Sequence, residues 1–131
     1  MLRAHWSTIY RPEWKDPKHD LYYIGFGVTH YRTRALNLQF AHKDVLDLGA
    51  ALERYSGSFS HVIVKTYIDD AVTRDNILKA GEVLKNAGVD DTVVILVSGH
   101  GAYDLSKEAT YYYGTYNIDV KNLATTAVSF D

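Results

Sequence analysis

Three short apolar runs alternate with two segments of helical periodicity, and this alternation limits the folds open to the chain. The apolar runs cover residues 21–28, 61–67 and 92–97 and are rich in β-branched and aromatic side chains, as strands are. Residues 41–55 and 73–87 instead repeat apolar side chains at the spacing of one helix face. Short connections between these segments favour right-handed crossovers and a mostly parallel sheet flanked by helices. We therefore predict an α/β fold.

Turn and capping residues mark the ends of these segments. Gly57, between two serines, ends the first helical segment, and Thr73 is placed to cap the second. Gly88 lies just past the second helical segment, where glycine commonly stops a helix. Residues 1–20 contain two tryptophans and two prolines without a sustained period, so we expect an irregular N-terminal arm there. The predicted domain covers residues 21–131.

The C-terminal part of the chain carries weaker signals. We expect a further strand or hairpin arm at residues 110–113 and no third helix before Asp131. A parallel sheet built from the three apolar runs alone would leave one edge unpaired, and such an edge invites pairing with another chain. The predicted architecture therefore looks unfinished.

Composition and charge exclude several classes of partner. The net charge of -2 provides no basic field of the kind that binding to nucleic acid or to an anionic membrane needs. The apolar runs are too short to span a bilayer, and the N-terminus lacks the apolar core of a secretory signal. The chain contains no cysteine, which excludes disulfides and thiolate metal ligands. We expect a cytoplasmic protein that binds neither nucleic acid nor membrane.

The motif Ser98-Gly99-His100-Gly101 presents one imidazole just after the third apolar run. Open α/β sheets build their sites at the carboxyl ends of their strands, so His100 is the first catalytic candidate, as a general acid-base. The flanking glycines permit a sharp turn, and the Gly101 amide is a candidate oxyanion donor. The alternative is a turn histidine bonded to a neighbouring carbonyl, and the pattern alone does not separate the two.

Other candidate motifs are weaker. Gly25-Phe26-Gly27 lacks the third glycine of a dinucleotide loop and is better explained by a crowded strand. Ser98 lacks the glycine that precedes a hydrolase nucleophile by two residues, and the six histidines show no spacing typical of zinc. Asp69-Asp70 and Asp90-Asp91 are typical of solvated turns, with calcium binding as the alternative. Asp44 suits the start of the first helix because a carboxylate interacts favourably with the helix dipole.

Several segments together resemble the caspase-like cysteine peptidases, including metacaspases and their bacterial relatives. In chain order the matching motifs are Tyr23-Ile24-Gly25-Phe26-Gly27-Val28 with Tyr31, Leu36-Asn37-Leu38-Gln39-Phe40-Ala41-His42-Lys43-Asp44-Val45, Ala71-Val72-Thr73-Arg74-Asp75-Asn76-Ile77, Asp91-Thr92-Val93-Val94 with Ser98-Gly99-His100-Gly101, and Tyr111-Tyr112-Tyr113 through Asp119. The last motif departs from the family pattern, because Asn117 replaces its first aspartate. The resemblance covers residues 21–131 and implies the N-terminal, large-subunit-like portion of a caspase-like domain.

The resemblance implies a catalytic His-Cys dyad. His100 is then the general acid-base, and the Gly101 amide contributes to the oxyanion hole. The family's cysteine thiolate attacks the peptide carbonyl from the next core strand, which these residues do not include. The expected partners are a peptide or protein substrate and a C-terminal, cysteine-bearing segment or subunit, without which the chain should be inactive. The alternative is a catalytically inactive caspase-like interaction or adaptor module.

The resemblance also suggests a substrate preference. In metacaspases an acidic residue at the entry to the first helix helps form an S1 pocket for Arg or Lys, and Asp44 occupies this position. Aspartate-specific caspases place an arginine shortly before that acid, where this chain has Leu38 and Gln39. A basic P1 residue is therefore expected, with Asp44 and Ser98 as substrate-binding residues. No metal or cofactor is expected, and calcium stays open as an activator.

Overall fold

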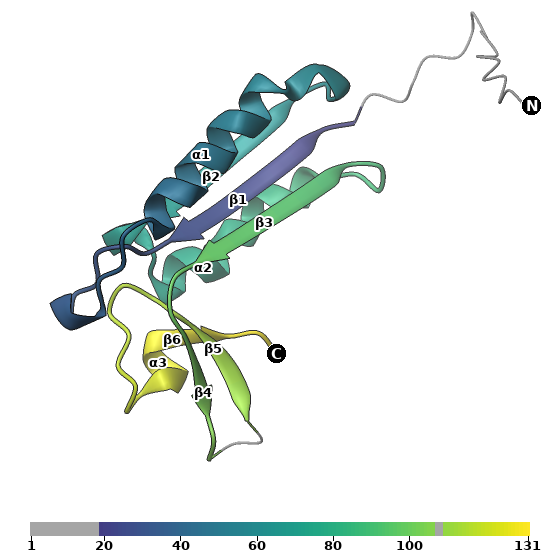
Figure 1. Ribbon diagram of the computed structural model, residues 1–131. Coiled ribbons are helices and arrows are strands. Elements are labelled where there is room, and N and C mark those ends of the chain that lie inside the picture. The colour runs from purple at the N-terminus through teal and green to yellow at the C-terminus, as the bar shows by residue number, and fades with distance from the viewer. Residues whose placement is uncertain (1–18, 107–108) are drawn as a thin grey trace, which may run out of the picture.

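A parallel sheet forms the centre of the computed structural model, which describes residues 19–106 and 109–131 (Figure 1). Strand β1 (Leu21–Gly27) lies between β2 (Val62–Ile68) and β3 (Thr92–Ser98), and both pairings are parallel. All seven residues of β1 are buried, as an apolar strand covered on both faces should be. The predicted α/β class and parallel sheet are confirmed.

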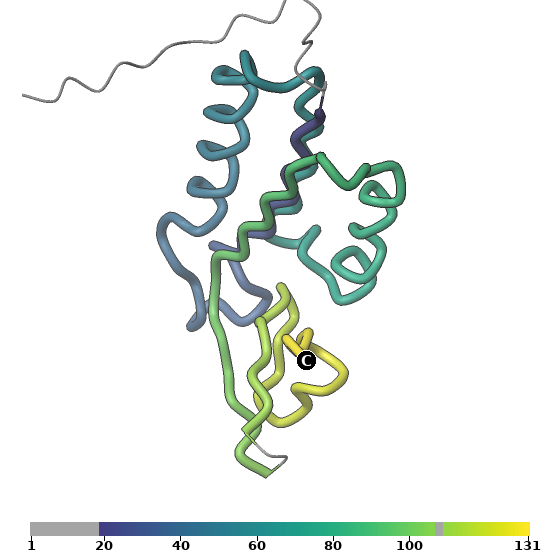
Figure 2. Tube along the Cα trace, turned by 90° about the vertical axis from the view of Figure 1, so that its right-hand side faces the viewer, coloured from purple at the N-terminus to yellow at the C-terminus, as the bar shows by residue number. Residues whose placement is uncertain are grey.

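Helices cover the two faces of this sheet (Figure 2). Helix α1 (Ala41–Arg54) packs on one face, where it contacts all three strands. Helix α2 (Arg74–Ala80) and the 3-10 helix η4 (Gly81–Asn86) lie on the other face. The remaining short 3-10 helices are η1 (Arg34–Leu36), η2 (Ser56–Ser58) and η3 (Asp69–Ala71). Among the described residues, no helix combines the length and apolarity needed to cross a membrane.

Two glycines of β1 let α1 approach the sheet closely. A Cβ atom on Gly25 would lie 2.5 Å from Cγ1 of Val45, and one on Gly27 would lie 2.6 Å from the backbone oxygen of Ala41. The explanation of Gly25-Phe26-Gly27 as glycines in a crowded strand therefore fits the structure. Val45 of α1 is fully buried in the space that these glycines leave. The helix therefore supplies the side-chain volume that fills the interface at these positions.

The second helical segment differs from its prediction. Thr73 caps it as expected, since its Oγ1 accepts a hydrogen bond from the Asn76 amide at 3.1 Å. The α-helix then ends at Ala80 and continues as η4, whereas one helix through Ala87 was predicted. Gly81 stands at the break, and glycine weakens an α-helix because it has more backbone freedom to lose. Gly81 is visible in the sequence as a residue that weakens helices, but the apolar periodicity continues past it to Ala87.

The C-terminal residues form a second, antiparallel sheet. It contains β4 (Gly101–Asp104), β5 (Thr110–Gly114) and β6 (Ala127–Ser129) in that order. The strand predicted at residues 110–113 is therefore confirmed. The expectation of no third helix was wrong, because α3 (Leu123–Thr126) forms a single turn. The Thr126 hydroxyl supports this turn by donating to the Asn122 oxygen at 2.8 Å, and such side-chain support does not appear as apolar periodicity.

Strand β3 is one of the two edges of the parallel sheet, and β2 is the other. Among the described strands β3 pairs with β1 alone. Its side chains Val93, Ile95 and Val97 are 43%, 59% and 38% exposed, which is high for apolar residues of a central sheet. Ile95 and Val97 line a groove on the face of the sheet that α2 covers, together with Ile24 and Phe26 of β1, Tyr113, α2, η4 and the C-terminal residues 128–130. The edge of β3 fits the unpaired sheet edge expected from the sequence.

We predict opposite effects for two glycine-to-alanine changes. G27A should lower the free energy of unfolding by about 1–3 kcal/mol, because the new Cβ meets the backbone of α1 rather than a movable side chain. G81A should be neutral or stabilise by up to about 1 kcal/mol, because Gly81 has helical φ and ψ and a Cβ atom there would meet no other atom within 4 Å. Urea unfolding followed by circular dichroism measures both. Equal stability of G27A and wild type would contradict the close packing of α1 on β1.

Candidate functional site

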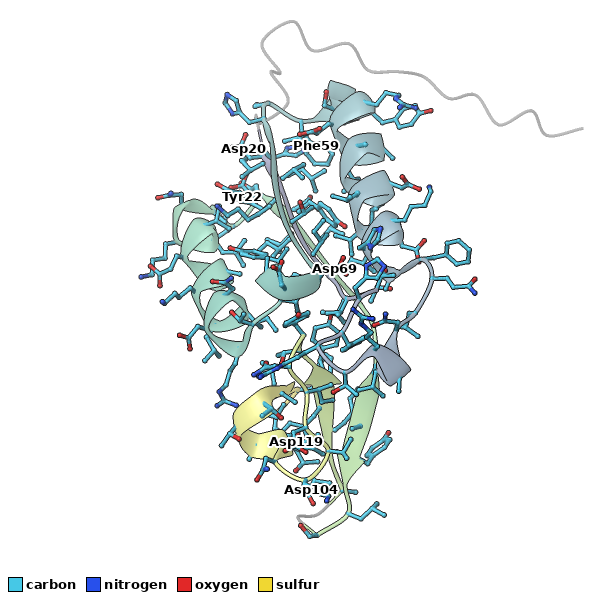
Figure 3. The ribbon with its side chains drawn as sticks, turned by 90° about the vertical axis from the view of Figure 1, so that its left-hand side faces the viewer. Asp20, Tyr22, Phe59, Asp69, Asp104 and Asp119 are labelled. Atoms are coloured by element: carbon cyan, nitrogen blue, oxygen red, sulfur yellow. The ribbon has the colours of Figure 1, made fainter. Side chains whose placement is uncertain are left out.

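The carboxyl ends of the three parallel strands meet at one edge of the sheet, and two groups of polar side chains lie there. The first surrounds His100, which follows β3. The second surrounds Asp69, which follows β2 and is labelled in Figure 3. The loop of residues 28–40 after β1 contributes to both. This is the edge at which open α/β sheets build their sites.

The His100 ring is held by a backbone carbonyl from the loop after β1. Its Nε2 lies 2.8 Å from the Leu36 oxygen, and the ring is partly buried. Since a carbonyl can only accept, Nε2 carries the proton and Nδ1 of the neutral imidazole keeps a lone pair. The His100 amide donates to the Tyr31 hydroxyl at 2.8 Å. This is the arrangement of a base oriented by a third group, although the carbonyl bond alone also suits a structural histidine.

The two flanking glycines are required by close contacts. Gly99 has φ +154°, and a Cβ atom there would lie 2.7 Å from the Tyr31 hydroxyl oxygen. A Cβ atom on Gly101 would collide with the ring of Tyr111. Gly101 pairs with Tyr113 while the Gly114 amide donates to the His100 oxygen at 2.8 Å. In an antiparallel ladder this register directs the Gly101 amide away from β5, so its role as an oxyanion donor stays a prediction.

A buried tyrosine joins the His100 turn to the two sheets. The Tyr113 hydroxyl lies 3.1 Å from the Ser98 oxygen and 3.3 Å from the Phe26 oxygen. Burial, with a smaller contribution from Tyr31, raises the pKa of Tyr113 far above its usual range. The phenol therefore stays protonated and donates a hydrogen bond at all physiological pH values. It fixes the end of β3 from which His100 projects.

The two predicted substrate-binding residues belong to different elements at the carboxyl edge of the sheet. Ser98 ends β3, and its backbone oxygen accepts hydrogen bonds from the Val28 amide and the Tyr113 hydroxyl, both at 3.1 Å. Asp44 is exposed in the first turn of α1, where its charge adds to the larger effect of Asp47 in raising the pKa of Lys43. These contacts are structural, and substrate binding by either residue stays a prediction.

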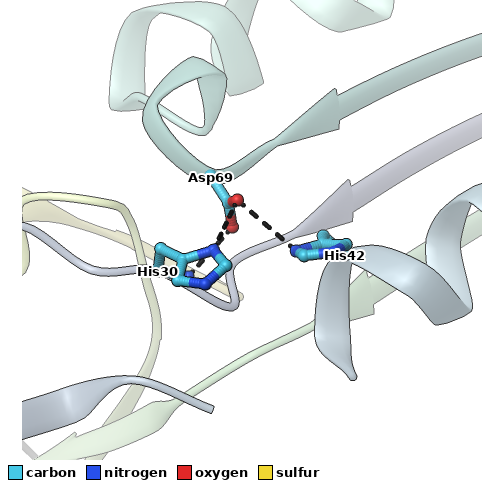
Figure 4. Close-up of side chains that lie close together, drawn as sticks. All are labelled: His30, His42 and Asp69. Carbon is cyan, nitrogen blue, oxygen red and sulfur yellow. Dashed lines mark hydrogen bonds and ion pairs between the residues drawn. The ribbon is translucent and has the colours of Figure 1, made fainter. Parts of the chain in front are cut away.

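Sequence reasoning missed a cluster of His30, His42 and Asp69 (Figure 4). The Nδ1 atoms of His30 and His42 lie 3.0 and 3.4 Å from Oδ2 of Asp69. The other oxygen, Oδ1, accepts the backbone amides of Thr29 at 2.8 Å and His30 at 3.0 Å. The three residues come from the ends of β1 and β2 and the start of α1. Since 39 residues separate His30 from Asp69, no local spacing signals the cluster.

The carboxylate of Asp69 is stabilised in its charged form. Burial alone would raise its pKa, but the hydrogen bonds from His30 and Thr29 outweigh burial, and the nearby His42 ring acts in the same direction. The pKa of Asp69 is therefore held below its ordinary value of 3.8. Asp69 also has φ 47°, a left-handed conformation that non-glycine residues rarely adopt. It is thus a fixed acceptor rather than the solvated turn residue expected from the sequence.

The chain has no match among known protein families, curated proteins or solved structures. Its chemistry must therefore be inferred from these two groups of residues. His100, with one ring nitrogen fixed and the other unprotonated, suits proton transfer. The cluster of two imidazoles and one carboxylate suits a cation.

The tautomer of His100 is directly testable. At about pH 8.5, well above the ordinary imidazole pKa, its neutral ring should carry the proton on Nε2, because Leu36 offers only an acceptor. His61 provides an internal contrast, since its Nδ1 lies 2.9 Å from a carboxylate oxygen of Asp20 and should hold the proton. Long-range proton–nitrogen NMR spectra distinguish the two forms. An Nδ1-protonated His100 would contradict its orientation by Leu36.

We also predict an acid-sensitive contribution from Asp69. Because its folded pKa lies below its unfolded value, the contribution to stability is complete above about pH 4 and is lost as the pH falls through the folded pKa. D69N should therefore unfold with a weaker dependence on pH than wild type between about pH 5 and pH 2. The exposed neighbour supplies the control, and D70N should keep the wild-type dependence. Parallel pH profiles for wild type and D69N would contradict the assignment.

Proposed function

We propose that this chain supplies the histidine half of a caspase-like cysteine endopeptidase. The proposal rests on the placement of His100. This histidine projects from the carboxyl end of a parallel strand, between two glycines, with Nε2 fixed by the Leu36 oxygen. A base held in this way leaves Nδ1 to exchange a proton with a nucleophile. The caspase-like form of the α/β fold is part of the same proposal.

The proposed reaction is acyl transfer through a thioester. Nδ1 of His100 accepts the thiol proton, and the thiolate attacks the carbonyl carbon of the scissile peptide bond. The carbonyl oxygen becomes an oxyanion that the Gly101 amide stabilises. His100 then gives its proton to the departing amine as the C–N bond breaks. Water hydrolyses the thioester with His100 acting again as base, which restores the thiol.

The nucleophile must come from another segment or chain, because these 131 residues contain no cysteine. The outer edge of β3 is the place to receive it. A strand added there in parallel would lie about 4.8 Å from β3 and would end beside Gly99 and His100. Side chains of the added strand would lie beside Ile95 and Val97, which are exposed in the described structure. One added strand thus both pairs the edge of β3 and brings a nucleophile next to the base.

The competing function is an inactive caspase-like interaction module. The same edge of β3 would then bind a partner strand through backbone hydrogen bonds without catalysis. The two functions differ in what the partner strand carries at its carboxyl end. A cysteine next to His100 makes the complex a peptidase, and any other residue leaves it a binding module.

Peptide cleavage separates these functions. The protein expressed from its native gene, with the cysteine-bearing partner if a second gene encodes it, should cleave fluorogenic peptides with Arg or Lys at P1 in preference to Asp. H100A should lower kcat/KM by at least about 100-fold, the lower range for general acid-base catalysis. H61Q is the matched control, because His61 is an exposed histidine at the opposite end of the sheet from His100.

The outcomes are distinct. Cleavage that H100A retains, in a protein whose circular dichroism matches wild type, would refute the role of His100. Preference for Asp at P1 would refute the role of Asp44 while leaving the peptidase proposal intact. Stable assembly without cleavage of any peptide would favour the interaction module.

A further inference from the structure

The cluster of His30, His42 and Asp69 has features that a simple ion pair does not need. The carboxylate is fixed on one side, because its Oδ1 accepts two backbone amides. Its Oδ2 faces both imidazoles, and the residues come from three separate elements (Figure 4). One histidine would suffice to pair with the charge of Asp69. The second is therefore the feature to explain.

His42 holds a polar atom without a hydrogen bond. Its Nδ1 is buried and has no hydrogen-bond partner in the described part of the chain, although Oδ2 of Asp69 is 3.4 Å away. The His42 side chain as a whole is 30% exposed, whereas its Nδ1 atom is buried. Buried nitrogen atoms of this kind normally have a partner, because leaving one unpaired is costly. An ion between Nδ1 and Oδ2 would serve both atoms.

The spacing of the atoms fits a small metal ion. In a tetrahedral site with bonds of about 2.0–2.1 Å, ligand atoms lie about 3.3–3.4 Å apart. The two Nδ1 to Oδ2 distances are 3.0 and 3.4 Å, and all three ligand atoms lie within 4.8 Å of one another. Small side-chain rotations would therefore bring them around one ion. A backbone rearrangement is not needed.

From this geometry we propose that His30, His42 and Asp69 bind one Zn²⁺ ion. Imidazole nitrogen suits zinc, whereas Ca²⁺ and Mg²⁺ prefer all-oxygen sites. Two histidines and one carboxylate leave the fourth tetrahedral position for water or a ligand. The backbone amides of Thr29 and His30 orient the carboxylate, as groups around metal ligands commonly do. None of these three ligands takes part in the proposed peptidase chemistry of His100.

Binding joins three elements of the fold. His30 belongs to the loop after β1, His42 to the first turn of α1 and Asp69 to η3 after β2. An ion that binds the folded chain more tightly than the unfolded chain raises the unfolding temperature. Zinc should therefore stabilise the carboxyl edge of the sheet.

The test uses the whole chain, purified without a polyhistidine tag, at about pH 7.5, because zinc binds the neutral form of imidazole. Calorimetric titration with Zn²⁺ should show one equivalent bound, and the unfolding temperature should rise with zinc. H42Q and D69N should weaken binding by more than about 100-fold, beyond the usual effect of an outer group. H61Q is the matched control, because His61 pairs with a single carboxylate at 2.9 Å. Its affinity should equal that of wild type.

Two further measurements address the native chain, so the test does not depend on the folding of a variant. Co²⁺ should give the intense visible absorption of a tetrahedral site and should be displaced by Zn²⁺. One equivalent of Zn²⁺ should shift the ring nitrogen resonances of His30 and His42 and leave those of His61 unchanged. Zinc binding that survives H42Q and D69N, weakening by H61Q to the same extent, or unshifted His30 and His42 resonances would each overturn the proposal. Binding of Mg²⁺ or Ca²⁺ with equal affinity would also overturn it.

Discussion

The close approach of α1 to β1 is the constraint on which both groups of polar residues depend. Gly25 and Gly27 remove side-chain volume from the strand, and Val45 occupies the space. A bulkier strand would push the helix outward. The first turn of α1 lies against the carboxyl end of β1, where Gly27 meets Ala41. The distance of α1 from the sheet therefore sets where His42 lies relative to Asp69. It also sets the path of the loop that places the Leu36 carbonyl against His100.

The main elements could be predicted because their signals are local. The apolar runs predict β1, β2 and β3. The helical spacing from residue 41 predicts α1 to within one residue of its observed end. The Thr73 cap could likewise be predicted, because threonine just before a helical segment is a preferred N-cap residue. The failures came where two local signals competed or where none existed. Gly81 interrupts the helix that the apolar periodicity predicts through Ala87. Helix α3 is supported by a side-chain hydrogen bond, which produces no periodic pattern in the sequence.

The site could be predicted only in part. His100 was identifiable because glycines flank it after an apolar strand, yet its partner is a backbone carbonyl, and every residue has one. Nothing in the sequence singles out Leu36 for that role. The cluster of His30, His42 and Asp69 left no signal for a related reason, since His30 and Asp69 meet only through the register of β1 against β2. A cluster that depends on how two strands pair cannot be predicted from residue spacing, because it forms only in the folded sheet.

The loop of residues 28–40 contributes to both groups of polar residues. Tyr31 and Leu36 hold His100, while Thr29 and His30 hold Asp69, so the two sites share one short stretch of backbone. Thermodynamic linkage then imposes a symmetry. If an ion at Asp69 changes the affinity for a ligand at His100, that ligand changes the affinity for the ion by the same factor. A substitution in this loop that alters the coupling therefore alters it equally in both directions.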